Sequence, residues 1–383
     1  MRIYLDNAAT TQMRPEVVKV MEPYFMEKYG NPGSFHDVGR EAKEAIEAAR
    51  QKTASILNCV PEEIVFTGGG TESCNLAVKG IALNRGKGHI ITQKTEHHAI
   101  LHPCEWLEKQ GFKVTYLDVD KDGLVSADDI KKAIKKDTIL VSIMYANNEI
   151  GTIYPIKAIA KVCKENNVLF HTDACQVGNT LTVDVDELGV DMLTLNGSKL
   201  YGPKGVGLLY IKRGIKIDPL IEGGSQEQRK RAGTENVPGI VAFAKALELS
   251  QHDKDKEVKR LRELTDNLIK GLLKIPNSRL NGPTGEQRMA NNANISFQGV
   301  EGESIVLHLN EHGICASTGS ACSSGSLEPS HVITSIGQES DYIHGSVRLS
   351  LGYYNTKKDV DEVLKVLPGI IEKLRLISPL AKK

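Results

Sequence analysis

Short apolar runs alternate with segments of helical periodicity from about residue 40 to residue 240. The apolar runs that predict strands are EEIVFTGGG (62–70), GHIITQKTEHHA (88–99), FKVTYLDVD (112–120), TILVSIMYANNE (138–149), VLFHTDA (168–174), DMLTLNG (191–197) and GVGLLYIK (205–212). The segments that predict helices are 71–83, 100–110, 127–136 and 156–167. Strands that alternate with crossover helices predict an α/β fold with a mainly parallel sheet between helices, in which ligands gather at the carboxyl ends of the strands.

The pattern changes after about residue 250. The elements expected there are a long charged helix at 255–274, a strand at 292–300, a helix near 303–313, a strand at 346–352 and a final helix at 356–377. Thr356 and Asp359 form a plausible capping pair for the final helix. We therefore expect a large domain at 15–255 and a smaller α+β domain at 256–383, which the N-terminal segment 1–14 joins.

Composition and charge exclude several classes of protein. A chain of 383 residues is long for one ordinary core, which also favours two domains. Lys plus Arg and Asp plus Glu both total 48, and a formal net charge of zero argues against nucleic acid as a partner. No apolar run approaches the roughly 18 residues of a membrane span, and the N-terminus lacks a signal-peptide core, so no membrane association and a cytoplasmic location are expected.

The cysteines differ in their surroundings. The chain has 7 cysteines without a CxxC pair, which predicts reduced thiols rather than disulfides. Those expected to be packing residues are Cys59, Cys74, Cys104, Cys163 and Cys175. Cys322, in contrast, lies within ASTGSACSSGS (316–326), whose turn and linker composition predicts a mobile segment.

Three sequence clusters follow predicted strands and carry candidate chemistry. TGGGTE (67–72) opens a helix and suits one phosphate, although a tight strand-to-helix turn explains it equally well. Asp173 ends a buried strand, where a carboxylate needs a partner or caps the next helix. Lys199 follows another strand; most lysines are solvated, but an enclosed one loses its proton and forms a Schiff base with an aldehyde.

Together the clusters predict a site for pyridoxal 5′-phosphate. The glycine turn would hold the phosphate, Asp173 would keep the pyridine nitrogen protonated, and Lys199 would carry the aldehyde. His97, just past a strand, would stack on the ring unless it is an ordinary loop histidine.

Ten short motifs along the chain resemble those of a known family. The motifs that carry the resemblance are YLDNAATT (4–11), YGNPGSFH (29–36), FTGGGTESCN (66–75), TEHHA (95–99), NNEIGT (147–152), HTDACQ (171–176), KLYGPKGVG (199–207), AGTEN (232–236), GSAC (319–322) and VRLSLG (347–352). In this order they resemble the cysteine desulfurases of the NifS-like group, within the class V aminotransferases of fold-type I pyridoxal-phosphate enzymes.

The resemblance implies roles for individual residues. Gly70 and Thr71 would hold the phosphate, and Asn196 and Ser198 would also bind the cofactor. Asn148 and Gln176 would contact the ring oxygen.

The resemblance also implies substrate-binding residues and a partner subunit. Thr234 would reach the phosphate of the partner subunit, which implies a homodimer. Asn31 and Arg348 would bind the carboxylate of L-cysteine.

The same resemblance makes Cys322 the nucleophile. Its thiolate would take the substrate sulfur as a persulfide, release alanine and pass the sulfur to an iron–sulfur scaffold protein. A mobile segment suits a carrier that must leave the pocket.

Ser198 departs from the family pattern, which has a histidine immediately before the lysine. Serine cannot act as a base near neutral pH, so turnover is expected to be weaker. A second interpretation follows, in which the protein is an assembly partner that docks the scaffold and lends Cys322 as a ligand of a shared iron–sulfur cluster. A third, a selenocysteine lyase, differs in substrate.

The segment DVDKDGLVSADD (118–129) has the spacing of a calcium loop. An alternating strand precedes it instead of a helix. We expect a strand, an Asp-Gly turn and a helix capped by Ser126.

Overall fold

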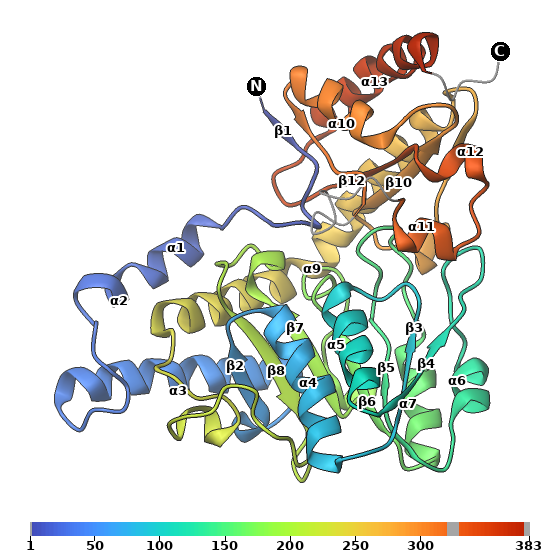
Figure 1. The fold of residues 1–383 in the computed structure, drawn as a ribbon. Helices are drawn as coiled ribbons and strands as arrows, with labels where there is room; N and C mark the ends of the chain where they lie inside the picture. The colour runs from blue at the N-terminus through green and yellow to red at the C-terminus, as the bar shows by residue number, and fades with distance from the viewer. Residues whose placement is uncertain (1, 320–328, 379–383) are drawn as a thin grey trace.

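A seven-stranded sheet forms the centre of the larger part of the molecule (Figure 1). In the computed structural model, which describes residues 2–319 and 329–378, its strands lie in the order β2 (Ile64–Thr67), β8 (Gly207–Ile211), β7 (Met192–Asn196), β6 (Leu169–Asp173), β5 (Thr138–Ser142), β3 (His89–Gln93) and β4 (Lys113–Leu117). Of these strands only β8 runs antiparallel to its neighbours. A connection as short as the one from β7 to β8 permits antiparallel pairing, whereas parallel strands need a crossover. The predicted α/β fold with a mainly parallel sheet is confirmed.

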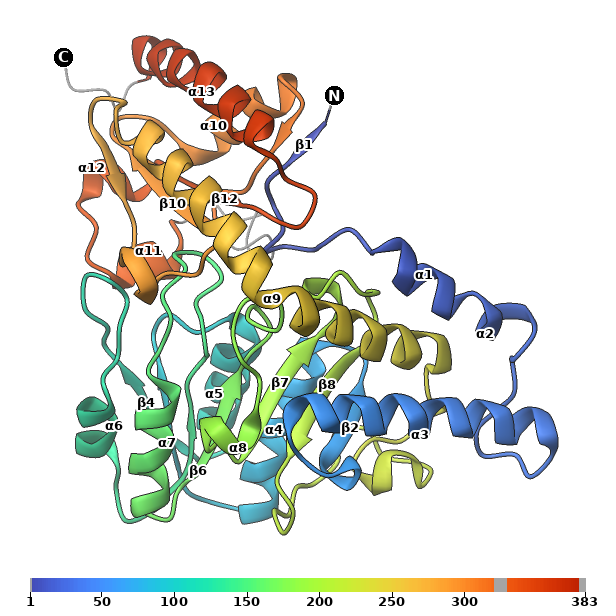
Figure 2. The same cartoon turned by 180° about the vertical axis from the view of Figure 1, so that it is seen from behind.

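Helices cover both faces of this sheet, as the opposite views in Figures 1 and 2 show. One face carries α4 (Gly70–Arg85) and α5 (His98–Lys109), and the other carries α3 (Asp37–Leu57), α6 (Ala127–Ala133), α7 (Ile156–Glu165) and the first half of α9 (Val237–Leu272). The side chains of consecutive strand residues point to opposite faces of the sheet. Ile90 packs into the α4/α5 core and Ile91 into the opposite core, as the alternation of a strand requires.

The smaller part of the molecule has its own sheet and core. β9 (Ser278–Leu280), β10 (Asn292–Phe297) and β12 (Ser346–Ser350) pair antiparallel, and α10 (Gly302–Glu311) and α13 (Lys357–Ile377) pack on them. The short α11 (His331–Ser335) and α12 (Ser340–Ile343) complete this part, while α8 (Val185–Leu188) belongs to the larger one. The N-terminal strand β1 (Ile3–Tyr4) lies parallel to β11 (Ile314–Cys315), so the start of the chain is part of the smaller core.

Helix α9 links the two parts and is longer than the sequence pattern predicts. The expected helix began at residue 255, whereas α9 begins at Val237. Asn236 caps it by accepting from the Gly239 N–H, and Pro238 sits in the first turn, where no amide partner is needed. Its first half packs in the larger core and its second half in the smaller one. The proposed domain boundary at 255/256 therefore falls inside a continuous helix and stays a prediction.

Two capping predictions are confirmed. Ser126 and Asp129 form a capping box at the start of α6, and at the start of α13 the Asp359 carboxylate accepts from the Thr356 amide at 2.8 Å. Before α6 the chain makes a turn in which Asp120 accepts from the amides of Asp122 and Leu124. The 118–129 segment is therefore a turn followed by a capped helix, as expected.

The helices α1 (Pro15–Met21) and α2 (Pro23–Met26) lie along α9 at the edge of the molecule (Figures 1 and 2), and Val17 of α1 is buried in the larger core. Phe25, Met26, Tyr29 and Phe35, on or after α2, are exposed. Within residues 2–319 and 329–378, no helix is both long and apolar enough to cross a membrane.

Candidate active site

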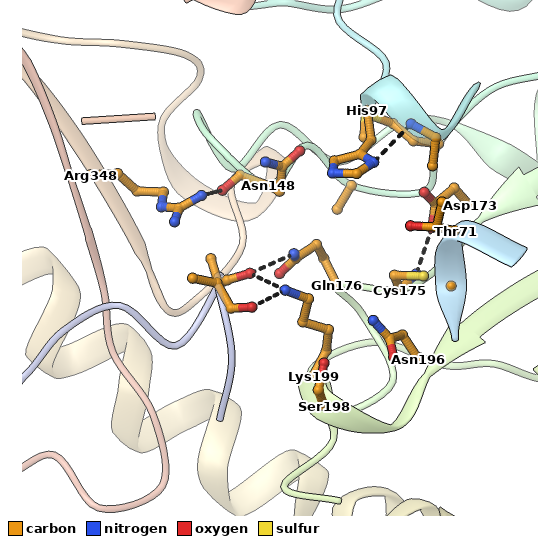
Figure 3. A pocket seen from close by; sticks show the side chains of 16 residues that line it. Thr71, His97, Asn148, Asp173, Cys175, Gln176, Asn196, Ser198, Lys199 and Arg348 are labelled. Atoms are coloured by element: carbon orange, nitrogen blue, oxygen red, sulfur yellow. Dashed lines mark hydrogen bonds between the residues drawn. The ribbon is translucent and has the colours of Figure 1, made fainter. Parts of the chain in front are cut away.

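A pocket of about 260 Å³ lies at the carboxyl ends of the parallel strands (Figure 3). Ten residues that the sequence nominated line it: Gly70, Thr71, His97, Asn148, Asp173, Gln176, Asn196, Ser198, Lys199 and Arg348. The others that line it are Ala8, Ala9, Ala99, Met144, Ala146 and Cys175. These residues come from the N-terminal segment after β1, from the ends of β6 and β7, from the segments that follow β2, β3, β5, β6 and β7, and from β12 of the smaller part. The fold rather than any one motif therefore assembles the pocket.

Lys199 lies in this pocket at the end of the short 3-10 turn that follows β7. Its Nζ donates to the carbonyl oxygen of Ala8 at 2.8 Å and also to that of Ala9 (Figure 3). The Thr11 amide and hydroxyl both donate to the Ser198 carbonyl oxygen, which fixes the N-terminal segment against the lysine turn. The sequence did not indicate this contact between residues 8–11 and the lysine.

Asp173 ends β6 on the floor of the pocket and is only 7% exposed. Its Oδ1 accepts from the Cys175 amide at 2.9 Å. Burial, together with the negative charge of Asp173, raises the pKa of the Cys74 and Cys175 thiols well above the usual value. Both thiols are therefore protonated near neutral pH, and neither is an effective nucleophile there.

The glycine turn between β2 and α4 leaves room beside the helix N-terminus. Gly69 has φ 153°, and a Cβ at Gly70 would lie 2.6 Å from the Cys175 sulfur. A side chain at Gly70 is therefore excluded. Glu72, in the first turn of α4, accepts from the Gly68 amide and pairs with Arg231 at 2.9 Å, which offsets its negative charge near this end of the helix. The turn thus has the features of an anion site.

His97 is the N-cap of α5, and its Nδ1 accepts from the Ala99 amide at 3.0 Å. This bond places the proton of the neutral ring on Nε2. Its neighbour His98 packs against His102 and His331, with ring centroids 4.7 and 4.8 Å apart. Burial and these neighbouring rings lower the pKa of His98 to about 4. At neutral pH His98 is uncharged.

Arg348, on β12, reaches the pocket from the smaller part and is 1% exposed. It donates through Nη1 to the Asn148 carbonyl oxygen at 3.1 Å and through Nη2 to Asp6 at 2.7 Å. Its buried Nε has no hydrogen-bond partner among the described residues. A donor left in this state favours a bound anion, since unsatisfied buried polar groups are costly.

Three nominated residues are not part of this pocket. Asn31 is exposed after α2, where it accepts from the Gly33 amide, and Thr234 is exposed before α9. Cys322 lies outside the described residues. Their roles stay predictions.

Cys175 corrects one sequence-based interpretation. It was expected to be only a packing residue, but its side chain lines the pocket beside Asp173 and Gly70. Its position two residues after a strand-end aspartate was the signal in the sequence. The N-terminal Ala8 and Ala9 gave no such signal.

A buried histidine beneath the site predicts acid sensitivity. His171, two residues before Asp173 on β6, bonds to Ser142 and Thr194, and burial lowers its pKa from 6.5 to about 4. The unfolded chain therefore binds the proton first as pH falls. We expect the free energy of unfolding to decrease by about 3 kcal/mol between pH 7 and pH 4 from this group alone. The free energy of unfolding, measured by urea titration at several pH values, should fall less between pH 7 and pH 4 in His171→Gln than in the control His308→Gln.

Comparisons with known proteins find relatives over nearly the whole chain. The family model for aminotransferase class-V matches residues 3–363. The chain is 57% identical to the cysteine desulfurase IscS of Methanosarcina thermophila, covering 100% of this chain and 95% of that protein. It is 56% identical to the cysteine desulfurase IscS of Dictyoglomus turgidum, covering 98% and 96%. Among solved structures, a NifS-like protein superposes with a TM-score of 0.92 at 38% identity, covering 98% of this chain and 100% of that one.

Proposed function

This chain belongs to the aminotransferase class-V family, and from that premise we propose that it is a pyridoxal-phosphate-dependent cysteine desulfurase. It takes sulfur from L-cysteine and releases L-alanine. The observation that carries the proposal is the convergence of the Lys199 amine, the Asp173 carboxylate and the α4 N-terminus on one pocket. Full-length identity of 57% to a cysteine desulfurase supports the same activity.

The pocket fits the cofactor by the chemistry of its donors. An added Cβ at Gly69 would meet nothing within 4 Å, so open space adjoins the α4 N-terminus there and suits the phosphate group together with Thr71. The buried Asp173 suits a protonated ring nitrogen, and the Lys199 amine suits the aldehyde carbon. His97 would cover one face of the ring, and Asn148, Gln176, Asn196 and Ser198 are proposed as further cofactor contacts.

When bound, pyridoxal phosphate supplies a conjugated ring that accepts the electron pair left at the substrate Cα. Arg348 would hold the substrate carboxylate through the Nε–H that has no partner among the described residues. The Lys199 amine would then take the Cα proton. Binding by Arg348 fixes which bond faces that amine.

The sulfur step belongs to Cys322. Its thiolate forms an S–S bond to the substrate sulfur as the substrate's Cβ–S bond breaks. The bonding pair stays with the carbon fragment, in which Cβ takes up a proton and becomes the methyl group of alanine. Cα then regains the proton that Lys199 took. The two sulfur atoms are oxidised and the carbon is reduced, so no external oxidant is required.

A homodimer is the proposed assembly. The exposed apolar side chains Phe25, Met26, Tyr29 and Phe35 support it, because a monomer rarely exposes so many large apolar groups together. The loop that bears Thr234 is held in a defined shape by a buried pair in which Arg50 meets Glu227 at 2.7 Å. This loop can therefore present Thr234 to a partner subunit's phosphate, and Asn31 would act at the substrate. An iron–sulfur scaffold protein as acceptor, and the cytoplasm as location, complete the proposal.

The serine at position 198 leaves two hypotheses to be tested. The protein is either an active desulfurase or an assembly partner that lends Cys322 to a shared cluster. Ser198 is buried beside Lys199 and carries no group that can move a proton near neutral pH. We expect the wild-type protein to release alanine and Ser198→His to release it about tenfold faster or more. Alanine formed from L-cysteine by the purified, cofactor-loaded proteins measures both rates.

The two hypotheses predict different wild-type results. An absence of alanine from both proteins, with the cofactor absorbance present, would favour the assembly partner. Equal rates would show that a histidine at this position supplies no proton transfer here.

A further inference from the structure

The ion pair between Asp6 and Arg348 joins the N-terminal segment to the wall of the pocket. Arg348 donates through Nη2 to the Asp6 Oδ1 at 2.7 Å; its side chain is 1% exposed and that of Asp6 is 18% exposed. Within residues 2–319 and 329–378, Asp6 is the only carboxylate at ion-pair distance from Arg348. The guanidinium charge at the pocket is therefore offset by an aspartate that does not itself line the pocket.

The backbone around Asp6 is fixed on the end of β12 without the help of its side chain. Asp6 forms a parallel bridge with Ser350. The Ser350 amide donates to the Leu5 carbonyl oxygen at 2.7 Å, and the Asn7 amide donates to the Ser350 carbonyl oxygen at 3.3 Å. Because these bonds use only backbone groups, a change of the Asp6 side chain leaves them in place and alters the contact with Arg348.

The three nitrogens of the Arg348 guanidinium have different surroundings. Nη2 meets the Asp6 carboxylate, whereas Nη1 donates to the neutral carbonyl oxygen of Asn148 at 3.1 Å. Nε is buried and has no hydrogen-bond partner among the described residues. The Arg348 backbone also exchanges hydrogen bonds with Ser317. The guanidinium thus keeps a second anchor at Asn148 when the charge of Asp6 is removed, and Nε is left for an anion.

We propose that Asp6 is a positioning residue that holds Arg348 ready and limits how tightly it binds the carboxylate of substrate and product. This rests on the proposed function, in which Arg348 binds the carboxylate of L-cysteine. An unpaired buried guanidinium is costly, so Asp6 stabilises the empty site. When a ligand carboxylate arrives, two like charges share one cation and repel each other. L-Alanine carries the same carboxylate, so this repulsion also favours release of the product.

The direction of the change in affinity distinguishes this role from a merely structural one. An asparagine at position 6 keeps a carbonyl oxygen that can accept from Arg348 but carries no charge. If Asp6 did no more than hold the arginine in place, Asp6→Asn would leave ligand binding unchanged or weaken it. If the charge of Asp6 opposes the ligand carboxylate, the same variant binds the ligand more tightly.

The test compares two ligands in the cofactor-loaded protein by the change that each causes in the yellow absorbance. L-Alanine has the amine and the carboxylate but no sulfur, so binding is measured without sulfur transfer. Ethylamine has the amine alone. In Asp6→Asn we expect the Kd of L-alanine to fall about fivefold or more, the size expected of one unit charge a few ångströms away. The Kd of ethylamine should match that of wild type.

Asp253→Asn is the matched control. Asp253 accepts from Arg14 at the same distance of 2.7 Å, the Arg14 side chain is 7% exposed, and neither residue lines the pocket. This variant removes the same charge from a similar pair and should bind both ligands as wild type does. Asp6→Ser, which also removes the charge, decides the matter if Asp6→Asn does not fold.

The outcomes separate the inference from the proposed function. An unchanged or raised Kd of L-alanine in the folded variant would overturn the inference alone, and so would an equal fall in the Kd of ethylamine. If neither variant folds, the carboxylate serves stability and the inference is wrong. A wild-type protein that gains no yellow absorbance, or binds L-alanine no more tightly than ethylamine, would overturn the proposed roles of Lys199 or Arg348 and this inference with them.

Discussion

Replacing Lys199 by alanine is expected to abolish the yellow absorbance of the cofactor-loaded protein and to reduce alanine release by at least about 10²–10⁴-fold. The side chain occupies the pocket, and no other lysine among the described residues lines it. The variant loses both the covalent link to the cofactor and the amine that takes the Cα proton, and proton transfer alone accounts for a factor of this size. Absorbance spectra and an alanine assay measure the two losses.

Lys204→Ala is a suitable control for this variant, because Lys204 lies on the same connection between β7 and β8 but is exposed. It should keep both colour and activity. An unchanged spectrum in the Lys199→Ala protein would refute the role of Lys199, and with it the proposed chemistry.

Replacing Cys322 by serine is expected to leave the yellow absorbance intact and to remove persulfide formation entirely. Serine keeps the size of the side chain but lacks the thiolate that attacks the substrate sulfur. The variant therefore separates cofactor binding from sulfur transfer. Incubation with L-cysteine, followed by mass spectrometry of the peptides, shows whether any cysteine has gained a sulfur atom.

Cys59→Ser, a change at a half-buried thiol outside the pocket, serves as the control and should form the persulfide normally. Persulfide in the Cys322→Ser protein would assign the step to another thiol. Cys175 would be the first to examine because it lines the pocket, although burial raises its pKa and keeps it protonated near neutral pH.

Much of the larger part could be predicted because its signals are local. Each predicted strand from residue 62 to residue 212 is a strand of the central sheet, and the helices between them are present. Gly70, Asp173 and Lys199 follow three of these strands, and their convergence was expected from the rule that the carboxyl ends of parallel strands share one edge.

The departures have physical reasons. Helix α9 extends 18 residues further toward the N-terminus than expected, from 255 back to 237, because its first half is buried all along one side and lacks the charged pattern that revealed the second half. The helices α1 and α2 were not predicted. They are short, and few of their side chains, such as Val17, are buried in the larger core, so no clear helical period of apolar residues marks them.

The sequence by itself determined which residues carry the chemistry, because strand periodicity, glycine turns and strand-end polar residues are short-range features. Only the tertiary structure decided which distant residues contact these side chains. The carbonyls of Ala8 and Ala9 lie against Lys199, Asp6 pairs with Arg348, and Glu149 accepts a hydrogen bond from Ser330. These contacts join residues more than 150 positions apart, and they depend on strand order and on the packing of two cores. A pattern of hydrophobic and polar positions specifies the face of an element, but not the distant segment that will cover it.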